Sequence, residues 1–161
     1  LHHSGFQDLQ GLERAPNMRV ILHYIRLLDE NLNPIEKCRT GQTVVFEIGY
    51  DCGDEQYHSM LIGIKAPNGE RIITVSSHFS DTAPIEGRGI FRCTIPHLPL
   101  KDGDYPLIVL VKNEAGGNAD GIDNAMNLTV APSPYFETGN FLIQGQGFIV
   151  QPSIWEYIPT Q

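Results

Sequence analysis

A two-residue alternation of apolar and polar side chains recurs along this chain and constrains its fold more than any other feature. In residues 43–52 every second side chain, from Val44 to Tyr50, is large and apolar, and the pattern returns in 60–66 and 104–112. Successive side chains of a β-strand point to opposite faces, so each stretch predicts a strand with one face on a core. Similar short stretches predict further strands at 19–28, 71–76, 89–96 and 126–130. About seven short strands, with no convincing amphipathic helix, predict an all-β, two-sheet antiparallel sandwich.

Two local patterns add detail to this prediction. Asn68-Gly69 predicts a tight hairpin, because glycine tolerates the positive φ of such turns. The segment from Leu98 to Tyr105 resembles the tyrosine corner of immunoglobulin-like sandwiches, in which the phenol hydroxyl ties down a loop. The alternative is an ordinary buried tyrosine at the start of a strand.

The C-terminal segment lacks charge. No ionisable side chain lies between Glu137 and Glu156, although the chain as a whole carries a net charge of −8. Its glycines, proline and glutamines exclude a membrane helix, which needs about 20 mostly apolar residues. Residues 148–150 predict an apolar strand, which must be buried by its own sheet, a second copy of the protein, or a ligand. Ile108 and Leu110 leave the outer face of the strand at 104–112 apolar, which offers the strand at 148–150 one surface to cover.

Composition excludes several classes of function. The 11 basic residues are scattered singly in an acidic chain, which argues against binding nucleic acid or an anionic membrane. Three widely spaced cysteines favour free, buried thiols in a reducing compartment over a Cys52–Cys93 bridge. Residues 1–17 predict a linker, since they are polar and lack periodicity, and 18–161 the domain.

No catalytic pattern is present. The chain has no Gly-x-Ser-x-Gly elbow and no phosphate-binding Gly-x-x-x-x-Gly-Lys motif, and its six histidines lack metal-site spacing. We therefore expect no enzyme activity, no metal and no cofactor. Two acidic groups, Asp51 with Asp54 and Glu55, and Asp120 with Asp123, suggest either a calcium site or solubilising loops, and we favour the loops.

Glycines at outward strand positions suggest a binding surface. Gly49 and Gly63 both fall in the middle of predicted strands, where glycine often marks a close approach to the backbone. If they share one face, that face forms a shallow polar trough that includes Glu47, Asp51 and Lys65. Sugars suit such a surface, because hydroxyls bond to carboxylates and Lys or Arg, and apolar sugar faces stack on aromatic rings. The alternative is a pair of β-bulges.

A family resemblance runs over residues 18–157. The segments 135–139, Tyr-Phe-Glu-Thr-Gly, and 147–155, Gly-Phe-Ile-Val-Gln-Pro-Ser-Ile-Trp, resemble the end of the C-terminal domain of Wzt-type ATP-binding subunits. The segments 39–50, 64–69 and 93–105 resemble the same domain in the same order. These subunits belong to ABC transporters that export O-antigen polysaccharide.

This resemblance implies a fold, a ligand and partners. The fold would be an immunoglobulin-like sandwich that dimerises by exchanging its C-terminal strands. The ligand would be the end of an O-antigen glycan, bound on a concave sheet face. The partners would be a homodimer mate, an ATP-binding domain of the same subunit ahead of residue 1, and the membrane subunit of the transporter. The domain would then be cytoplasmic, at the inner membrane, without direct membrane insertion.

The candidate carbohydrate-binding residues combine the trough with possible aromatic or polar contributors. They are Glu47, Asp51, Lys65, His78, Trp155 and Tyr157. Two alternatives stay open: a structural or dimerisation domain that binds another protein, and a metal-dependent, sugar-modifying enzyme on a jelly-roll scaffold.

Overall fold

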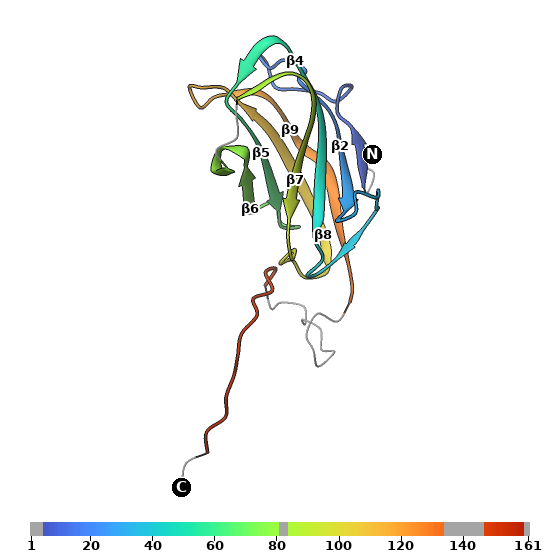
Figure 1. Cartoon of the computed structure of the whole chain (residues 1–161), viewed down its shortest axis with the longest axis vertical. Coiled ribbons are helices and arrows are strands. Elements are labelled where there is room, and N and C mark those ends of the chain that lie inside the picture. Colours follow the sequence, from blue (N-terminus) through green and yellow to red (C-terminus); the bar gives the residue numbers. More distant parts are fainter. Residues whose placement is uncertain (1–4, 81–83, 134–146, 160–161) are drawn as a thin grey trace.

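The computed structural model describes residues 5–80, 84–133 and 147–159, which form two packed β-sheets (Figure 1). One sheet has the strand order β1 (Phe6–Asp8), β2 (Leu22–Asp29), β4 (Val44–Tyr57), β7 (Ile85–Ile95). The other has the order β3 (Cys38–Arg39), β9 (Asn118–Ala131), β8 (Gly103–Lys112), β5 (Ser59–Lys65), β6 (Arg71–Ser76). Neighbouring strands are antiparallel except for the parallel pair β3 and β9. The 3-10 helix η1 (Ser77–Ser80) is the only helix in the described ranges, so the all-β prediction is confirmed.

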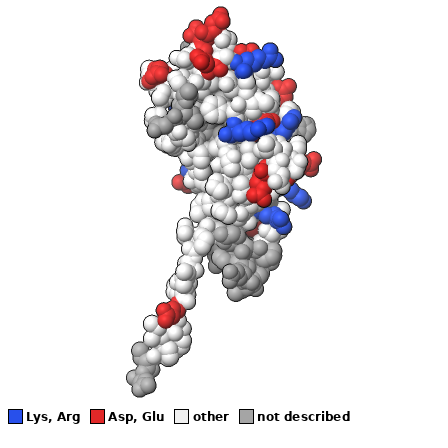
Figure 2. Space-filling model, in the orientation of Figure 1, with Lys and Arg blue, Asp and Glu red and all other residues white. Residues whose placement is uncertain are grey.

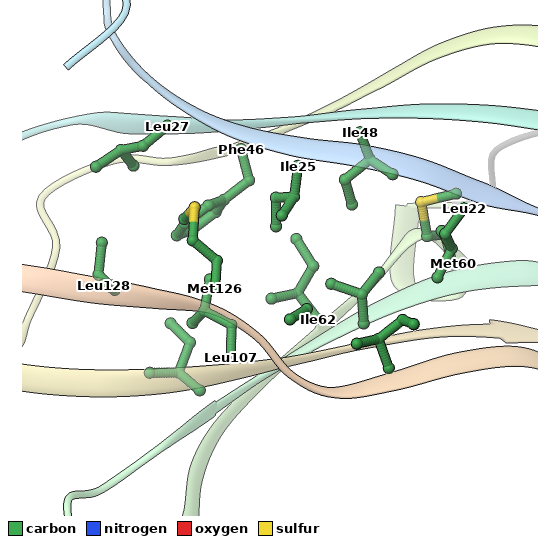
Figure 3. Packing of buried hydrophobic residues seen from close by; sticks show 14 of the residues in the cluster. Leu22, Ile25, Leu27, Phe46, Ile48, Met60, Ile62, Leu107, Met126 and Leu128 are labelled. Carbon is green, nitrogen blue, oxygen red and sulfur yellow. The ribbon is translucent and has the colours of Figure 1, made fainter. Parts of the chain in front are cut away.

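One hydrophobic core lies between the sheets. Alternate side chains of β2 and β4, such as Ile25 and Phe46, point toward Ile62 of β5, Leu107 of β8 and Leu128 of β9 (Figure 3). All five are at most 2% exposed. Burying one such side chain stabilises the fold by about 1.5–3 kcal/mol. The alternation of apolar and polar residues in the sequence therefore reflects the burial of every second side chain between the sheets.

Tyr105 fixes the turn that precedes β8. Its ring is fully buried, and its hydroxyl donates a hydrogen bond to the carbonyl oxygen of Lys101 at 2.8 Å. A bond from this hydroxyl to the backbone a few residues upstream defines a tyrosine corner, so that interpretation holds over an ordinary buried tyrosine. Burial raises the pKa of Tyr105 to about 12.

The segment predicted to be a linker joins the domain. Strand β1 pairs with β2, and Leu9 is fully buried. The Arg14 guanidinium, 6% exposed, binds the carboxylate of Asp120 at 3.0 Å. Asp120 lies in β9 and not in a solubilising loop. The linker prediction is therefore wrong for β1, Leu9 and Arg14, and the loop prediction is wrong for Asp120. A three-residue strand is too short to show periodicity, and the ion pair joins residues 106 positions apart.

The shared trough is also wrong, because its two glycines lie in different sheets. Gly49 is in β4 and Gly63 is in β5. A Cβ on Gly49 would lie 2.2 Å from the ring of Tyr24, and one on Gly63 would lie 2.8 Å from the Arg71 side chain. Each glycine therefore makes room for a side chain of the neighbouring strand that crosses it. Register shifts lie beside both positions, so the β-bulge alternative was closer.

The cysteines are free thiols, as predicted. Burial raises the pKa of Cys38 to about 12, and it also raises those of Cys52 and Cys93. These thiols therefore stay protonated at neutral pH, which makes them poor nucleophiles. No helix in the described part of the chain has the length and apolar character needed to cross a membrane.

Among its described residues, the C-terminal segment contacts the domain at residues 148–150. The strand predicted at 148–150 is reduced to an isolated bridge between Ile149 and Leu100, supported by a bond from the Val150 amide to the Pro99 carbonyl at 2.7 Å. Beyond it the chain extends away from the sheets (Figure 1). Ile154 is fully exposed there. Residues 135–139, which carried part of the family resemblance, lie outside the described residues.

Candidate functional site

A row of four side chains crosses the outer face of the four-stranded sheet. The strand registers place Phe6 of β1 opposite Arg26 of β2, Arg26 opposite Glu47 of β4, and Glu47 opposite Arg92 of β7. We call these four residues, together with Tyr24, the Glu47 row. Since every member comes from a regular strand, the backbone holds the row rigidly.

Glu47 is the buried centre of the row. Its side chain is 7% exposed, whereas those of Arg26 and Arg92 are 40% and 47% exposed. Arg92 donates a hydrogen bond from Nε to Oε1 at 3.1 Å, and its Nη2 lies 3.1 Å from the same oxygen in an ion pair. The Tyr24 hydroxyl donates to Oε2 at 3.1 Å. Arg26 Nη1 lies 3.9 Å from Oε2. The carboxylate thus lies between two partly exposed guanidinium groups and helps to orient them. Because one negative charge lies between two positive charges, the row has an excess positive charge.

Aromatic rings flank the guanidinium of Arg26. Its Cζ atom lies 5.1 Å from the ring centroid of Phe6 and 5.5 Å from that of Tyr24. The two rings stack with centroids 6.0 Å apart. Phe6 is 40% exposed, so it offers a solvent-facing aromatic surface beside a cation. Desolvation raises the pKa of Tyr24, and its bond to Glu47 adds to the effect, so the hydroxyl remains a donor.

A hollow of about 320 Å³ opens next to Arg92. It lies between the two sheets at their edge strands, β7 and β6. Its floor is mainly apolar, with Ile48, Met60 and Phe91, and hydroxyls from η1 and β6 line its rim. Arg92 belongs to both the hollow and the Glu47 row, so the two features meet at β7.

Two of the six predicted site residues lie on this face. Glu47 is the centre of the row. Asp51 lies on the same face further along β4, opposite Arg88. Asp51 accepts a hydrogen bond from the Gly53 amide at 2.9 Å, which shapes the strand locally. Lys65 lies on the other sheet, where its ammonium bonds to Asp123 and Asn124.

The other three predicted residues are apart from the row. His78 is in η1, and its Nδ1 lies 3.0 Å from Nε2 of His58. Trp155 and Tyr157 are on the extended C-terminal segment, 91% and 88% exposed. Figure 2 shows this segment as uncharged except for one acidic side chain, while basic and acidic groups lie close together on the domain face in view.

Four members of the Glu47 row were not predicted from the sequence: Phe6, Tyr24, Arg26 and Arg92. A single sequence shows that Arg26 and Arg92 sit within predicted strands, but not that both lie opposite Glu47. The register between strands brings them together, and it depends on turns and bulges that periodicity does not report.

Within the described ranges, no cluster of three or more His, Cys, Asp or Glu side chains is placed to hold a metal ion. What the row offers is hydrogen-bond donors and an aromatic surface.

A family model shows the family of this chain, and a solved structure shares its fold. The family model described as the Wzt C-terminal domain matches residues 13–143. A solved structure described as the crystal structure of the C-terminal domain of wzt superposes with a TM-score of 0.68, at 14% identity, over 94% of this chain and 92% of the other. At that identity the superposition shows the shared fold alone. A search of curated protein sequences finds no match.

Proposed function

Because this chain belongs to the Wzt C-terminal domain family, we propose that it is a non-catalytic module that binds O-antigen polysaccharide for an ABC transporter. In this proposal the glycan is held by its terminal residues. The module acts on the cytoplasmic side of the inner membrane, together with an ATP-binding domain of its own subunit and with the membrane subunit. The fold is interpreted as an immunoglobulin-like sandwich, which the tyrosine corner at Tyr105 supports.

The observation that carries the proposal is the Glu47 row. Glycan hydroxyls, and any acidic group on the glycan, present oxygen acceptors to protein donors. Arg26 and Arg92 carry donors pointed outward by a carboxylate that is itself almost fully buried. A hydrogen bond to a charged group contributes about 1.5–3 kcal/mol, so two or three such bonds give a useful affinity.

An aromatic surface and a hollow flank these donors. Phe6 can stack on the apolar face of a sugar ring at one end of the row, as aromatic side chains do with other apolar groups. The hollow beside Arg92 lies at the other end and has room for a sugar-sized group. We therefore assign the glycan to the outer face of the four-stranded sheet. Of the residues predicted from the sequence, Glu47 and Asp51 belong to this proposed site, and Lys65 does not.

Replacing Arg92 tests this assignment. Arg92→Ala removes donors at the centre of the proposed site, while Glu47 keeps its contacts to Tyr24 and Arg26. We expect the affinity for O-antigen oligosaccharide from the source organism, measured by calorimetry, to fall at least about tenfold, the equivalent of about 1.4 kcal/mol.

Arg71→Ala is the matched control for Arg92→Ala. Arg71 lies over Gly63 on the other sheet, so its replacement should leave the affinity unchanged. Thermal melts of both variants establish that they are folded. Equal affinities for the two variants and the parent would refute the site, whereas absence of glycan binding by the parent protein would refute the function.

We also propose that the C-terminal segment mediates dimer formation by strand exchange. Ile154, Trp155, Tyr157 and Ile158 are all at least 71% exposed. Among its described residues, their segment contacts its own domain at residues 148–150. Each large apolar side chain gains about 1.5–3 kcal/mol when buried, which favours a second copy as its cover. The exchange would bring Trp155 and Tyr157 against the other copy, where they stay candidates for stacking on sugar.

Truncation tests the dimer. Removing residues 151–161 should convert a dimer to a monomer in light scattering coupled to size exclusion, while Ser153→Ala should leave the dimer intact. A full chain that is monomeric at all concentrations would refute the exchange. A dimer that binds no glycan would favour the structural or dimerisation domain instead.

A further inference from the structure

Two histidines meet at the end of the domain near the hollow. His58 occupies the turn between β4 and β5, and His78 lies in η1. Nε2 of His58 lies 3.0 Å from Nδ1 of His78, and the ring centroids are 4.9 Å apart. The His58 side chain is 36% exposed and His78 is exposed, so both rings are accessible from solvent.

A carboxylate lies beside the opposite nitrogen of His58. Oε1 of Glu114 is 3.8 Å from Nδ1 of His58. A carboxylate in this position favours the tautomer that carries its proton on Nδ1, and this leaves a lone pair on the Nε2 that faces His78. Histidines that bind metals commonly donate their second N–H to a carboxylate. At 3.8 Å Glu114 is beyond hydrogen-bond distance and acts on His58 through its charge.

We propose that His58 and His78 chelate one divalent transition-metal ion, with Glu114 orienting His58. Metal–imidazole bonds are about 2.0–2.1 Å long, so two ligands of one ion are separated by about 2.9 Å at a right angle and about 3.3 Å at a tetrahedral angle. The observed 3.0 Å falls in that interval. No third ligand from His, Cys, Asp or Glu joins them among the described residues, so water completes the coordination.

The ion would link two parts of the surface that otherwise share few bonds. It would tie η1 to the β4–β5 turn, in addition to the bond from the Met60 amide to the Ser77 hydroxyl at 3.0 Å. Phe79 of η1 is 74% exposed and lines the hollow. Metal binding would thereby fix the rim of the hollow, whether or not the glycan occupies it.

Calorimetric titration with CuCl₂, NiCl₂ and ZnCl₂ tests the site. The full chain should carry His2→Gln and His3→Gln throughout, because these adjacent histidines can bind the same ions. We expect one ion per chain, with Cu²⁺ bound more tightly than Ni²⁺ or Zn²⁺, as imidazole sites generally prefer.

Variants locate the ion. His58→Gln and His78→Gln should each abolish the binding, and His23→Gln, at a histidine outside the site, should leave it intact. Glu114→Gln should weaken it about tenfold, the lower end of the range for residues that orient metal ligands, since Glu114 is 79% exposed. Melts without metal establish that the variants are folded.

The site is overturned if no ion binds the histidine-substituted background, or if His58→Gln and His78→Gln bind as the parent does. In the first case the two imidazoles form only a hydrogen bond. Either result leaves the glycan proposal standing, because that proposal depends on the other features of the outer face.

Discussion

Asp120 should be one of the most sensitive positions in the chain. It is fully buried in β9 and accepts bonds from the amides of Ile21 and Leu22, each at 2.8 Å, and from Nε of Arg14 at 3.0 Å. Asp120→Ala leaves a guanidinium that is 6% exposed without its counter-charge, and two buried amides without acceptors. Removing one partner of a buried ion pair costs about 3–5 kcal/mol, and each unsatisfied amide adds about 1–3 kcal/mol unless water enters.

We therefore expect Asp120→Ala to lower the free energy of unfolding by at least about 3–5 kcal/mol, out of a total of about 5–15 kcal/mol for a typical domain. At about 2–4 °C per kcal/mol, Tm falls by about 6–20 °C. Urea denaturation followed by far-UV circular dichroism measures the loss. Tryptophan fluorescence is unsuitable, because Trp155 is 91% exposed and remote from the core.

Two further variants sharpen the test of Asp120. Asp123→Asn is the control: it lies three residues further along β9, and its side chain is 69% exposed. Its amide oxygen keeps an acceptor beside the ammonium of Lys65, which is 11% exposed, so we expect it to cost much less than Asp120→Ala. Combining Asp120→Ala with Arg14→Met should cost less than the sum of the single changes, because the second change removes the charge that the first left unpaired. A loss below about 1 kcal/mol for Asp120→Ala would refute the buried-pair reasoning.

Two other predictions follow from the packing and from the pKa shifts. Gly49→Ala should lower the free energy of unfolding by about 1–3 kcal/mol, because the new Cβ would lie 2.2 Å from the Tyr24 ring, and Tyr24→Ala should relieve part of that cost. Gly11→Ala, with no atom within 4 Å of its Cβ, is the control in the same urea titrations, and an equal effect of both variants would contradict the explanation. Stability should also fall as pH rises from about 9 to about 12. Burial raises the pKa of Cys38 from 9.0 to about 12 and that of Tyr105 from 10.0 to about 12, so the unfolded chain loses these protons first. Denaturation at fixed urea across that range measures the slope, and Cys38→Ala should reduce it. A stability that is constant to pH 12 would show that neither group is shielded from water in the folded state.

The all-β fold was predictable because periodicity is a local property. The strand predicted at 71–76 has the same bounds as β6, and Asp104–Lys112 falls within β8 with one residue added. Strands β4, β7 and β9 run several residues beyond the predicted limits, through stretches such as 53–57 and 118–125 where charged residues and glycines hide the alternation. In these stretches pairing with a neighbouring strand keeps the chain extended where its own side chains give no signal.

The candidate site was predictable only in part. Glu47 stood out as a carboxylate on an outward position, but its partners Arg26 and Arg92 come from strands whose register the sequence does not specify. Gly49 and Gly63 were correctly placed in mid-strand, but the trough required the two glycines to share one face, and they lie in different sheets. Side chains, and not a ligand, fill the space above both glycines.

The central claim is that the outer face of the four-stranded sheet binds the glycan. The most direct test is a nuclear magnetic resonance titration of the ¹⁵N-labelled chain with O-antigen oligosaccharide from the source organism. We expect saturable shifts for the amides of Phe6, Arg26, Glu47 and Arg92, with the amide of Lys65 on the other sheet unaffected. Shifts confined to the five-stranded sheet around Lys65, or no shifts at saturating oligosaccharide, would contradict it.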